Sequence, residues 1–406
     1  MHFESIKNKI VLLRCDFNEP IKDEILESTK RIEANVITIH ELLARKNKVF
    51  LISHHSDAGQ TLKLVFNYLE KSFQGKSKVK YINTIDQNVV KEYFNLNKNT
   101  HLDFNNPENE NIILLENTRL FGEDLDESND LGFAKFLGSP ADCYVYDAFS
   151  VGHRDHASTT GVANILPSCF GPTFLKEYNS LKEITDNIPG SLIFMGGAKL
   201  STKLPMVNRF LDAGATVCLG GAMTHQILKY QNVDIKESYL EKDFELDEKA
   251  LNKLLEHIKN KSLILPTELI FNKEGNKIVD GIFNFEQIEN IILEKNIKNT
   301  RIKNILWNGP VGMYEDGEIK GTADIYNFIK NLNNNTGDKK IFTVVGGGDT
   351  ITFLEEEKTR ENQKDETNEN FENDFSYVSL SGGAMLEFLS TGTLPILSHI
   401  SIKSVI

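Results

Sequence analysis

Cysteine is scarce in this chain of 406 residues. The four cysteines form no C-x-x-C pair, and none has a histidine at zinc-binding spacing. A cysteine-based zinc module is therefore excluded. We expect the cysteines to be buried free thiols in a protein kept under reducing conditions.

Long apolar runs and excess positive charge are also missing. No run approaches the roughly 20 apolar residues that span a bilayer, and the first residues do not show the pattern of a secretory signal. Lysine and arginine total 45 against 58 acidic residues, which gives a formal charge of −13. An acidic chain binds nucleic acid and anionic membranes poorly, so we expect neither as a partner and expect the cytoplasm as the location.

Two common nucleotide-binding signatures are missing as well. The sequence has no G-x-x-x-x-G-K-[ST] segment, which excludes a P-loop protein, and no G-x-G-x-x-G follows a predicted strand. Any nucleotide must therefore bind through other residues.

The composition is that of a packed globular protein, with 40% hydrophobic and 25% charged residues. The length suggests two domains. Apolar runs predict strands near residues 9–17, 48–53, 78–83, 111–116 and 142–146, and again near 191–197, 215–221, 262–268, 303–310, 340–350 and 375–383. Amphipathic segments such as 28–46, 61–73 and 200–212 predict helices between them. This alternation indicates α/β domains with parallel sheets covered by helices on both faces. The polar segment 355–374 is expected to be a solvated loop.

Charged side chains follow the predicted strands of the first half. Asp16 and Asn18, His54, Arg119, and then His153 and Arg154 come directly after strands, and Arg31 begins a helix. Ligands bind at the carboxyl ends of parallel strands, and arginine matches phosphate and carboxylate geometry. These residues predict a site for a small, multiply charged anion. The alternative is that each arginine makes a surface ion pair.

The second half carries a glycine-rich turn, "VVGGGDT", between a predicted strand and a helix. Gly346, Gly347 and Gly348 would let the backbone approach a ligand, and a helix start binds phosphate. Asp349 is a candidate Mg²⁺ ligand, and Thr350 would cap the helix or contact phosphate. A tight structural turn is an equal alternative. Lys199 and Lys203 share one helical face, and Asn308 and Glu315 follow another strand.

The sequence resembles the phosphoglycerate kinases. The resemblance rests on segments that span nearly the whole chain in the family's order: "VLLRCDFNEP", "LISH", "LLENTRL", "VYDAFSVGHRDHAST", "MGGAKLSTK", "LGGAM", "LWNGPVGMYE", "VVGGGDT" and "SGGAMLEFL". It implies a monomer of two Rossmann-like domains joined by a helix and hinge. It also implies phosphoryl transfer in glycolysis between 1,3-bisphosphoglycerate and ADP, giving 3-phosphoglycerate and ATP, with Mg²⁺.

The resemblance also implies domain limits and residue roles. The N-terminal domain would comprise residues 1–174 and 390–406, a connecting helix 175–187, and the nucleotide-binding domain 188–389. The 3-phosphoglycerate ligands would be Asp16, Asn18, Arg31, His54, Arg119 and Arg154. The nucleotide ligands would be Lys199, Lys203, Gly220, Asn308, Glu315, Gly346, Gly347, Gly348, Asp349 and Thr350, with Asp349 also binding the metal. Arg31, Lys199 and Gly347 would act directly in catalysis.

The sequence departs from the family pattern at several places. The family's "SHLGRP" reads "SHHSDAG" here, so by simple count Asp57 stands at the position of a phosphate-binding arginine. The loop is shorter than in the family, so one alternative is that Asp57 points elsewhere, and another is that Lys63 or His55 compensates. The segment 279–303 lacks the family's Gly-, Asp- and Pro-rich hinge sequence. Two alternatives follow: a family member with weakened catalysis that mainly binds nucleotides or anions, and a kinase for another small acid.

Overall fold

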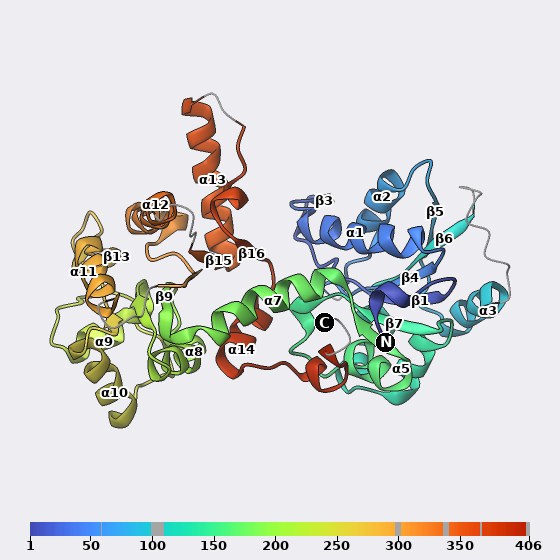
Figure 1. Cartoon of the computed structure of the whole chain (residues 1–406), viewed down its shortest axis with the longest axis horizontal. Coiled ribbons are helices and arrows are strands. Elements are labelled where there is room, and N and C mark those ends of the chain that lie inside the picture. The colour runs from blue at the N-terminus through green and yellow to red at the C-terminus, as the bar shows by residue number, and fades with distance from the viewer. Residues whose placement is uncertain (58, 99–108, 297–301, 336–340, 366–367, 403–406) are drawn as a thin grey trace. The chain divides into compact units, whose positions relative to one another are not determined.

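The computed structural model describes residues 1–57, 59–98, 109–296, 302–335, 341–365 and 368–402. The chain divides into two compact units, unit 1 (residues 1–179 and the segment from Thr393 onward) and unit 2 (Ser180–Gly392) (Figure 1). Each is built on its own six-stranded parallel sheet, which confirms the predicted α/β architecture. The boundary between the two units falls inside helix α7 (Pro172–Asp186). The domain limits at residues 174 and 187, which come from the sequence, stay a proposal.

The sheet of unit 1 has the strand order β5-β6-β4-β1-β7-β8. Its strands are β1 (Ile10–Arg14), β4 (Lys48–Ile52), β5 (Lys78–Ile82), β6 (Glu110–Leu115), β7 (Cys143–Tyr146) and β8 (Ser168–Phe170). The first five were predicted, and the edge strand β8 was not. A small antiparallel hairpin, β2 (Ile21–Lys22) with β3 (Ile25–Leu26), follows β1.

Helices cover both faces of this sheet, so its central strands β1, β4 and β7 are buried at every position. Val49 and Leu51 of β4 pack in one core with Ile39 of α1. Phe50 points to the opposite face, where its ring meets Phe94 of α3 at 5.3 Å. The helices of unit 1 are α1 (Lys30–Ala44), α2 (Lys63–Ser72), α3 (Gln87–Lys98), α4 (Glu123–Glu127), α5 (Leu131–Gly138), α6 (Val162–Ile165) and the first part of α7.

A buried carboxylate, Asp147, fastens three elements of unit 1 together at the end of β7. It accepts hydrogen bonds from the Thr38 hydroxyl on α1 and, at 2.8 Å, from the backbone N–H of Phe174 in the first turn of α7. Asn35 Nδ2 donates to the Asp147 carbonyl at 3.2 Å, while Asn35 Oδ1 accepts from the backbone N–H of Asp16 at 2.7 Å. Asn35 Nδ2 also lies 3.4 Å from the carboxylate, so Asn35 links both polar groups of Asp147 to the turn that carries Asp16.

We predict that Asp147 gives the fold a negative dependence of stability on pH. Burial raises the pKa of Asp147 to about 7. Between about pH 4 and 7 the folded chain keeps a proton that the unfolded chain releases, so the free energy of unfolding falls as pH rises. Replacing Asp147 by asparagine should make that slope less negative by up to about 1.4 kcal/mol per pH unit. Chemical denaturation at several pH values measures this slope, with Asp124→Asn, at an exposed side chain on α4, as the control.

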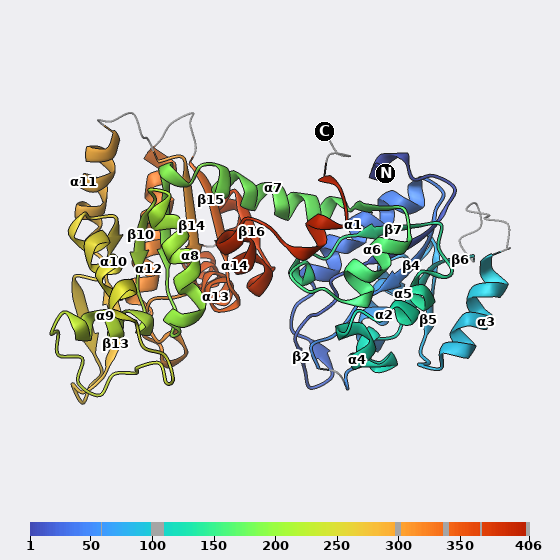
Figure 2. The same ribbon diagram turned by 90° about the horizontal axis from the view of Figure 1, so that it is seen from below.

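The sheet of unit 2 is also six-stranded and parallel, in the order β11-β10-β9-β14-β15-β16 (Figure 2). Its strands are β9 (Ser191–Met195), β10 (Thr216–Leu219), β11 (Leu263–Ile264), β14 (Asn304–Asn308), β15 (Phe342–Gly346) and β16 (Tyr377–Ser379). All of them lie within segments predicted as strands. An antiparallel hairpin, β12 (Glu268–Phe271) with β13 (Ile278–Ile282), was not predicted.

The helices of unit 2 are α8 (Leu200–Asp212), α9 (His225–Tyr230), α10 (Glu248–Lys259), α11 (Phe285–Asn296), α12 (Lys320–Asn335), α13 (Gly348–Asp365) and α14 (Gly382–Thr391). Phe194 of β9 and Trp307 of β14 share one core with Tyr326 of α12 and Phe353 of α13. Helices α8 and α14 pack against each other. Part of the segment 279–303, whose sequence departs from the family's hinge, forms β13 and α11, while 297–301 lies outside the described residues.

The prediction of a solvated loop at 355–374 is wrong for most of that segment. Helix α13 continues to Asp365, and residues Phe371–Asp374 form a 3₁₀ turn. Phe371 of the 3₁₀ turn is buried in the core of unit 2, whereas the helical part after Leu354 depends on charge pairing. Lys358, almost fully buried, lies 2.8 Å from the Glu369 carboxylate, 3.4 Å from Glu361 and 3.7 Å from Asp374.

The C-terminal segment belongs to unit 1. The backbone N–H of Ile396 donates to the Gly152 carbonyl at 3.3 Å, and His399 Nδ1 lies 2.7 Å from the Asn164 side-chain oxygen. Of the segment 390–406 that was predicted to join the N-terminal domain, residues 403–406 lie outside the described residues. All four cysteines are buried and free, as expected. Within the described ranges, no helix combines the length and apolar character needed to cross a bilayer.

Candidate active site

A small cavity in unit 1 gathers positive side chains at the carboxyl ends of the strands. Its wall includes His54 after β4, Arg119 after β6 and Arg154 after β7, three residues that the sequence placed in one site. The wall also includes the acidic residues Asp126 and Glu127. Arg119 Nη2 lies 3.9 Å from the carboxylate of Glu127. We call this cavity the basic pocket.

The remaining candidates of unit 1 lie beside the basic pocket without lining it. Arg31, at the start of α1, donates from Nη1 to the Asn18 carbonyl, and its Nε lies 3.6 Å from Asp16 Oδ2. Asn18 Oδ1 accepts from the backbone N–H of Ser56 at 2.7 Å, and Arg119 Nη1 donates to the Ser56 carbonyl at 2.6 Å. A continuous chain of contacts therefore connects Arg31 with Arg119.

Arg14 is a functional candidate that sequence reasoning missed. It is the last residue of β1, almost fully buried, and its Nη2 lies 3.2 Å from His54 Nδ1. A guanidinium group only donates, so Nδ1 must accept and the neutral His54 ring carries its proton on Nε2. The available signal was a charged residue inside the apolar run "VLLRC".

The electrostatics of the basic pocket keep His54 neutral. Burial, followed by the charges of Arg14, Arg154 and Arg119, lowers the pKa of His54 well below its usual value. The ring can then meet an anion only as a neutral donor, through Nε2. Positive charge for an anion comes from the arginines.

Neither residue proposed to compensate for Asp57 faces the basic pocket. Both ring nitrogens of His55 are occupied: Nε2 lies 3.0 Å from the Glu19 carbonyl, and Nδ1 accepts from the backbone N–H of Asp57 at 3.1 Å. The Lys63 ammonium lies over the ring of Phe66, 4.5 Å from its centroid. The expectation that one of them supplies the missing charge is therefore not supported.

The glycine turns of unit 2 pack backbone against backbone. A Cβ at Gly196 would lie 2.0 Å from the carbonyl oxygen of Pro310, which leaves no room for a side chain. Lys203 Nζ donates to the Gly196 carbonyl at 2.6 Å and to Asn308 Oδ1 at 2.8 Å, while Asn308 Nδ2 donates to the Gly346 carbonyl at 3.0 Å. Two predicted nucleotide ligands, Lys203 and Asn308, thus hold the turns together.

Replacing Lys203 by methionine is predicted to cost stability. Burial lowers the pKa of Lys203 to about 8, with Asp349 opposing the shift. The substitution leaves the oxygens of Gly196 and Asn308 without their donor, so the free energy of unfolding should fall by about 1–2 kcal/mol. Denaturant titration measures the loss. Lys229→Met, at an exposed lysine on α9, should change the midpoint little, and an equal loss there would contradict the assignment.

The start of α13 presents its ligand candidates unevenly. Gly347 has φ +99°, a conformation that favours glycine, and it turns the chain from β15 into the helix. The Thr350 hydroxyl is buried and accepts from the Gly309 backbone N–H at 2.8 Å. Asp349 and Lys199 are exposed, and within the described part of the chain neither has a side-chain hydrogen bond or ion pair. These two remain available to a ligand.

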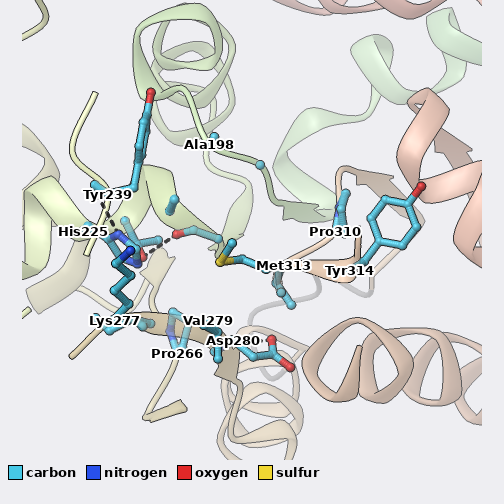
Figure 3. A pocket seen from close by; sticks show the side chains of 18 of the residues that line it. Ala198, His225, Tyr239, Pro266, Lys277, Val279, Asp280, Pro310, Met313 and Tyr314 are labelled. Atoms are coloured by element: carbon cyan, nitrogen blue, oxygen red, sulfur yellow. Dashed lines mark hydrogen bonds between the residues drawn. The ribbon is translucent and has the colours of Figure 1, made fainter. Parts of the chain in front are cut away.

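A cavity of about 550 Å³ opens beside these turns, and we call it the unit 2 cavity (Figure 3). Its size lies in the range of small-molecule sites, roughly 300–1,000 Å³. Of the predicted residues, Asp349 and Glu315 line it. Gly220 does not, because its Cβ position is taken by Val311, and Gly221 lines the cavity instead.

Most of the cavity wall was missed from the sequence. These residues lie in the turns after β10, β11 and β14, in the loop after α9, and in the unpredicted β12–β13 hairpin. Most are apolar, so a search for charged side chains and glycine-rich turns did not find them. They include Ala222, His225, Tyr239, Pro266, Leu269, Ile278, Val279, Val311 and Met313. The wall is mostly apolar, which suits a nucleotide base, and it also includes the carboxylates of Glu237, Asp280, Glu315 and Asp349.

The described residues contain no group of three or more His, Cys, Asp or Glu side chains placed to hold a metal ion. Asp349 is a single exposed carboxylate at a helix start. Mg²⁺ commonly binds through one or two carboxylates, with substrate phosphates and water as its other ligands. The donor set therefore fits Mg²⁺ that arrives with a nucleotide.

Comparison with known proteins agrees with this geometry. The family profile described as phosphoglycerate kinase matches residues 2–392. The phosphoglycerate kinase of Finegoldia magna is 33% identical over 414 residues, covering 96% of each chain, and that of Borreliella burgdorferi is 32% identical over 416 residues, covering 97% of this chain and 96% of the relative. The structure is similar to that of phosphoglycerate kinase from Coxiella burnetii, with a TM-score of 0.74 at 25% identity, covering 98% of this chain and 97% of that one. The chain belongs to the phosphoglycerate kinase family.

Proposed function

We propose that the chain transfers a phosphoryl group reversibly from 1,3-bisphosphoglycerate to ADP, giving 3-phosphoglycerate and ATP in glycolysis. In the reverse direction the acceptor is the carboxyl group of 3-phosphoglycerate. The observation that carries the proposal is that a chain of this family gathers basic side chains in the basic pocket of unit 1 and has, in unit 2, an exposed Lys199 beside a cavity whose wall includes Asp349.

In unit 1, the basic pocket would hold the phosphate that is not transferred. Arg119 and Arg154 supply charge, and His54 donates from Nε2 in the tautomer that Arg14 fixes. Asp16 would accept from the C2 hydroxyl, with Asn18 beside it. Arg31 would face the reacting carboxyl group.

In unit 2, the nucleotide base would occupy the apolar part of the cavity, and Glu315 would bind the ribose. Lys199 and the backbone N–H groups from Gly347 onward would contact the phosphates. Lys203 and Asn308 would act mainly by holding those turns in place. Asp349 would bind Mg²⁺, which when present neutralises phosphate charge and orients the phosphoryl oxygens.

The chemistry requires no general base. A carboxylate and a nucleotide phosphate are both ionised near neutral pH, since a carboxyl pKa is about 4. The protein must align the reactants and neutralise a loose, charged transition state. Arg31 and Lys199 are the side chains suited to that task, because each carries a fixed positive charge beside a backbone turn.

The proposal includes a cytoplasmic location, a monomeric state and no nucleic-acid or membrane partner. These follow from the family and from the acidic composition. Analytical ultracentrifugation tests the monomer directly.

A coupled assay with 3-phosphoglycerate, ATP and Mg²⁺ tests the function. We expect turnover that requires all three components. No turnover by a folded preparation would end the proposal. Turnover with another small acid, and none with 3-phosphoglycerate, would favour a different kinase on the same fold. Nucleotide binding without turnover would favour the weakly catalytic alternative, which no observation here supports over the working enzyme.

A further inference from the structure

A buried histidine lies in the wall of the unit 2 cavity and is not explained by the proposed mechanism. His225 begins α9, immediately after the turn that follows β10. Its side chain is buried against the fold but forms part of the cavity wall, beside Tyr239 (Figure 3).

One ring nitrogen of His225 has a fixed role. Nδ1 lies 2.8 Å from the backbone carbonyl of Tyr239. A carbonyl oxygen only accepts, so Nδ1 carries the proton in this contact. Burial lowers the pKa of His225, so the ring is neutral near pH 7. A neutral ring protonated on Nδ1 has a lone pair on Nε2, and among the described residues Nε2 has no hydrogen-bond partner.

The wall also holds the hydroxyls of Thr224, Tyr239 and Tyr314, and the Thr224 hydroxyl already donates to the Gly221 carbonyl at 2.8 Å. A tyrosine hydroxyl can donate or accept, whereas Nε2 of His225 only accepts and so selects for a donor on the base. The neighbouring wall is apolar, formed by Pro266, Val279 and Met313. The carboxylate of Asp280 is already engaged, because it accepts from the backbone N–H groups of Gly281 at 2.7 Å and Gly321 at 2.8 Å. The Lys277 side chain is exposed to solvent.

We propose that His225 reads the base of the bound nucleotide: its Nε2 accepts a hydrogen bond from an exocyclic amino group, so that the chain prefers a 6-aminopurine to a 6-oxopurine. This inference rests on the proposed function, because it assumes that the unit 2 cavity binds a nucleotide. It adds a residue that sets base preference.

The preference follows from pairing donors with acceptors. An amino group offers a hydrogen to Nε2, whereas a 6-oxo group places one lone pair opposite another. A buried acceptor left without a donor is costly, so discrimination of about tenfold is expected, which corresponds to about 1.4 kcal/mol. Phenylalanine at this position keeps a ring of similar size but has no acceptor, so the discrimination should disappear.

The experiment measures binding of ADP and inosine diphosphate by calorimetry near pH 7, without turnover. The wild-type protein should bind ADP about ten times more tightly than inosine diphosphate. His225→Phe should bring the two affinities within about twofold. His257→Phe is the matched control, because His257 lies on α10 outside the cavity wall, with Nδ1 bound to Ser262 at 2.9 Å; it should keep the wild-type ratio.

A second measurement needs no variant. The diphosphate of unsubstituted purine riboside lacks the 6-amino group, and the wild-type protein should bind it several-fold more weakly than ADP. Equal affinities for all three nucleotides, or an unchanged ratio in His225→Phe, overturn the inference while leaving the kinase assay unaffected. If no nucleotide binds and the coupled assay shows no turnover, the proposed function fails and the inference fails with it.

Discussion

Replacing Lys199 by alanine is expected to lower kcat by about a thousandfold, in the range reported for charged groups that stabilise a transferring phosphoryl group. Thermal stability should hardly change. Lys199 precedes α8 at an exposed position, and within the described residues its ammonium group has no partner whose loss would destabilise the fold. Surface substitutions of this kind usually change the free energy of unfolding by no more than about 0.5 kcal/mol.

The measurement pairs the coupled assay at saturating substrates with a thermal unfolding curve. Lys203→Met gives the contrasting case, because Lys203 is bonded to Gly196 and Asn308 and its loss should appear in stability. The sequence suggested that the two lysines share one helical face, but Lys199 lies just before α8 in extended conformation and only Lys203 lies within the helix. The two variants should then differ, one in turnover and one in folding. A folded Lys199→Ala variant with nearly normal turnover would remove Lys199 from the catalytic group.

The sequence predicted the sheet architecture well because the strands are buried on both faces. Such strands appear as short apolar runs, and here most of them end in a glycine or a polar turn. The strands that were missed carry weaker signals: β8 is a short edge strand, β12 is only partly buried, and β13, although buried, is interrupted by Asp280 and Gly281.

The polar part of α13 was missed for another reason. Its residues after Leu354 include little that packs in a core, so hydrophobic periodicity could not find the helix. Glutamate, lysine and arginine nevertheless favour helices, and pairs such as Arg360 with Glu357 at 3.0 Å support this one. The buried Lys358 binds carboxylates from outside the helix, which only tertiary structure reveals.

The candidate site was predictable where its residues follow strands, as His54, Arg119 and Arg154 do. Much of the wall of the unit 2 cavity was not, because Tyr239 lies in a loop and Val279 lies in the unpredicted strand β13. Nor did the sequence distinguish side chains that are available to a ligand from side chains that hold backbone turns in place. Lys199 and Lys203 are equivalent candidates in the sequence. Only the structure shows that the Lys203 ammonium donates to the Gly196 carbonyl, whereas Lys199 is exposed.

Replacing Asp57 by arginine is expected to tighten binding of 3-phosphoglycerate by about ten- to a hundredfold, since one charge-assisted hydrogen bond contributes about 1.5–3 kcal/mol. The backbone before this side chain is fixed beside the basic pocket. Arg119 Nη1 donates to the Ser56 carbonyl at 2.6 Å, and Asn117 Nδ2 lies 3.4 Å from the Asp57 carbonyl. An arginine there begins close to Arg119, whereas the native carboxylate repels an anion.

Calorimetry with 3-phosphoglycerate measures the change, and Asp57→Asn serves as the matched control. The asparagine removes the negative charge that repels the phosphate, but its side chain is too short to donate to the phosphate as an arginine would. It should therefore tighten binding only a few-fold. Added salt should shrink the gain at this exposed position, because charges separated through solvent are screened within about 10 Å at 0.1 M ionic strength. If Asp57→Arg folds normally and binds no more tightly than wild type, the phosphate does not reach this edge of the basic pocket, and Arg119 and Arg154 must hold it without help from residue 57.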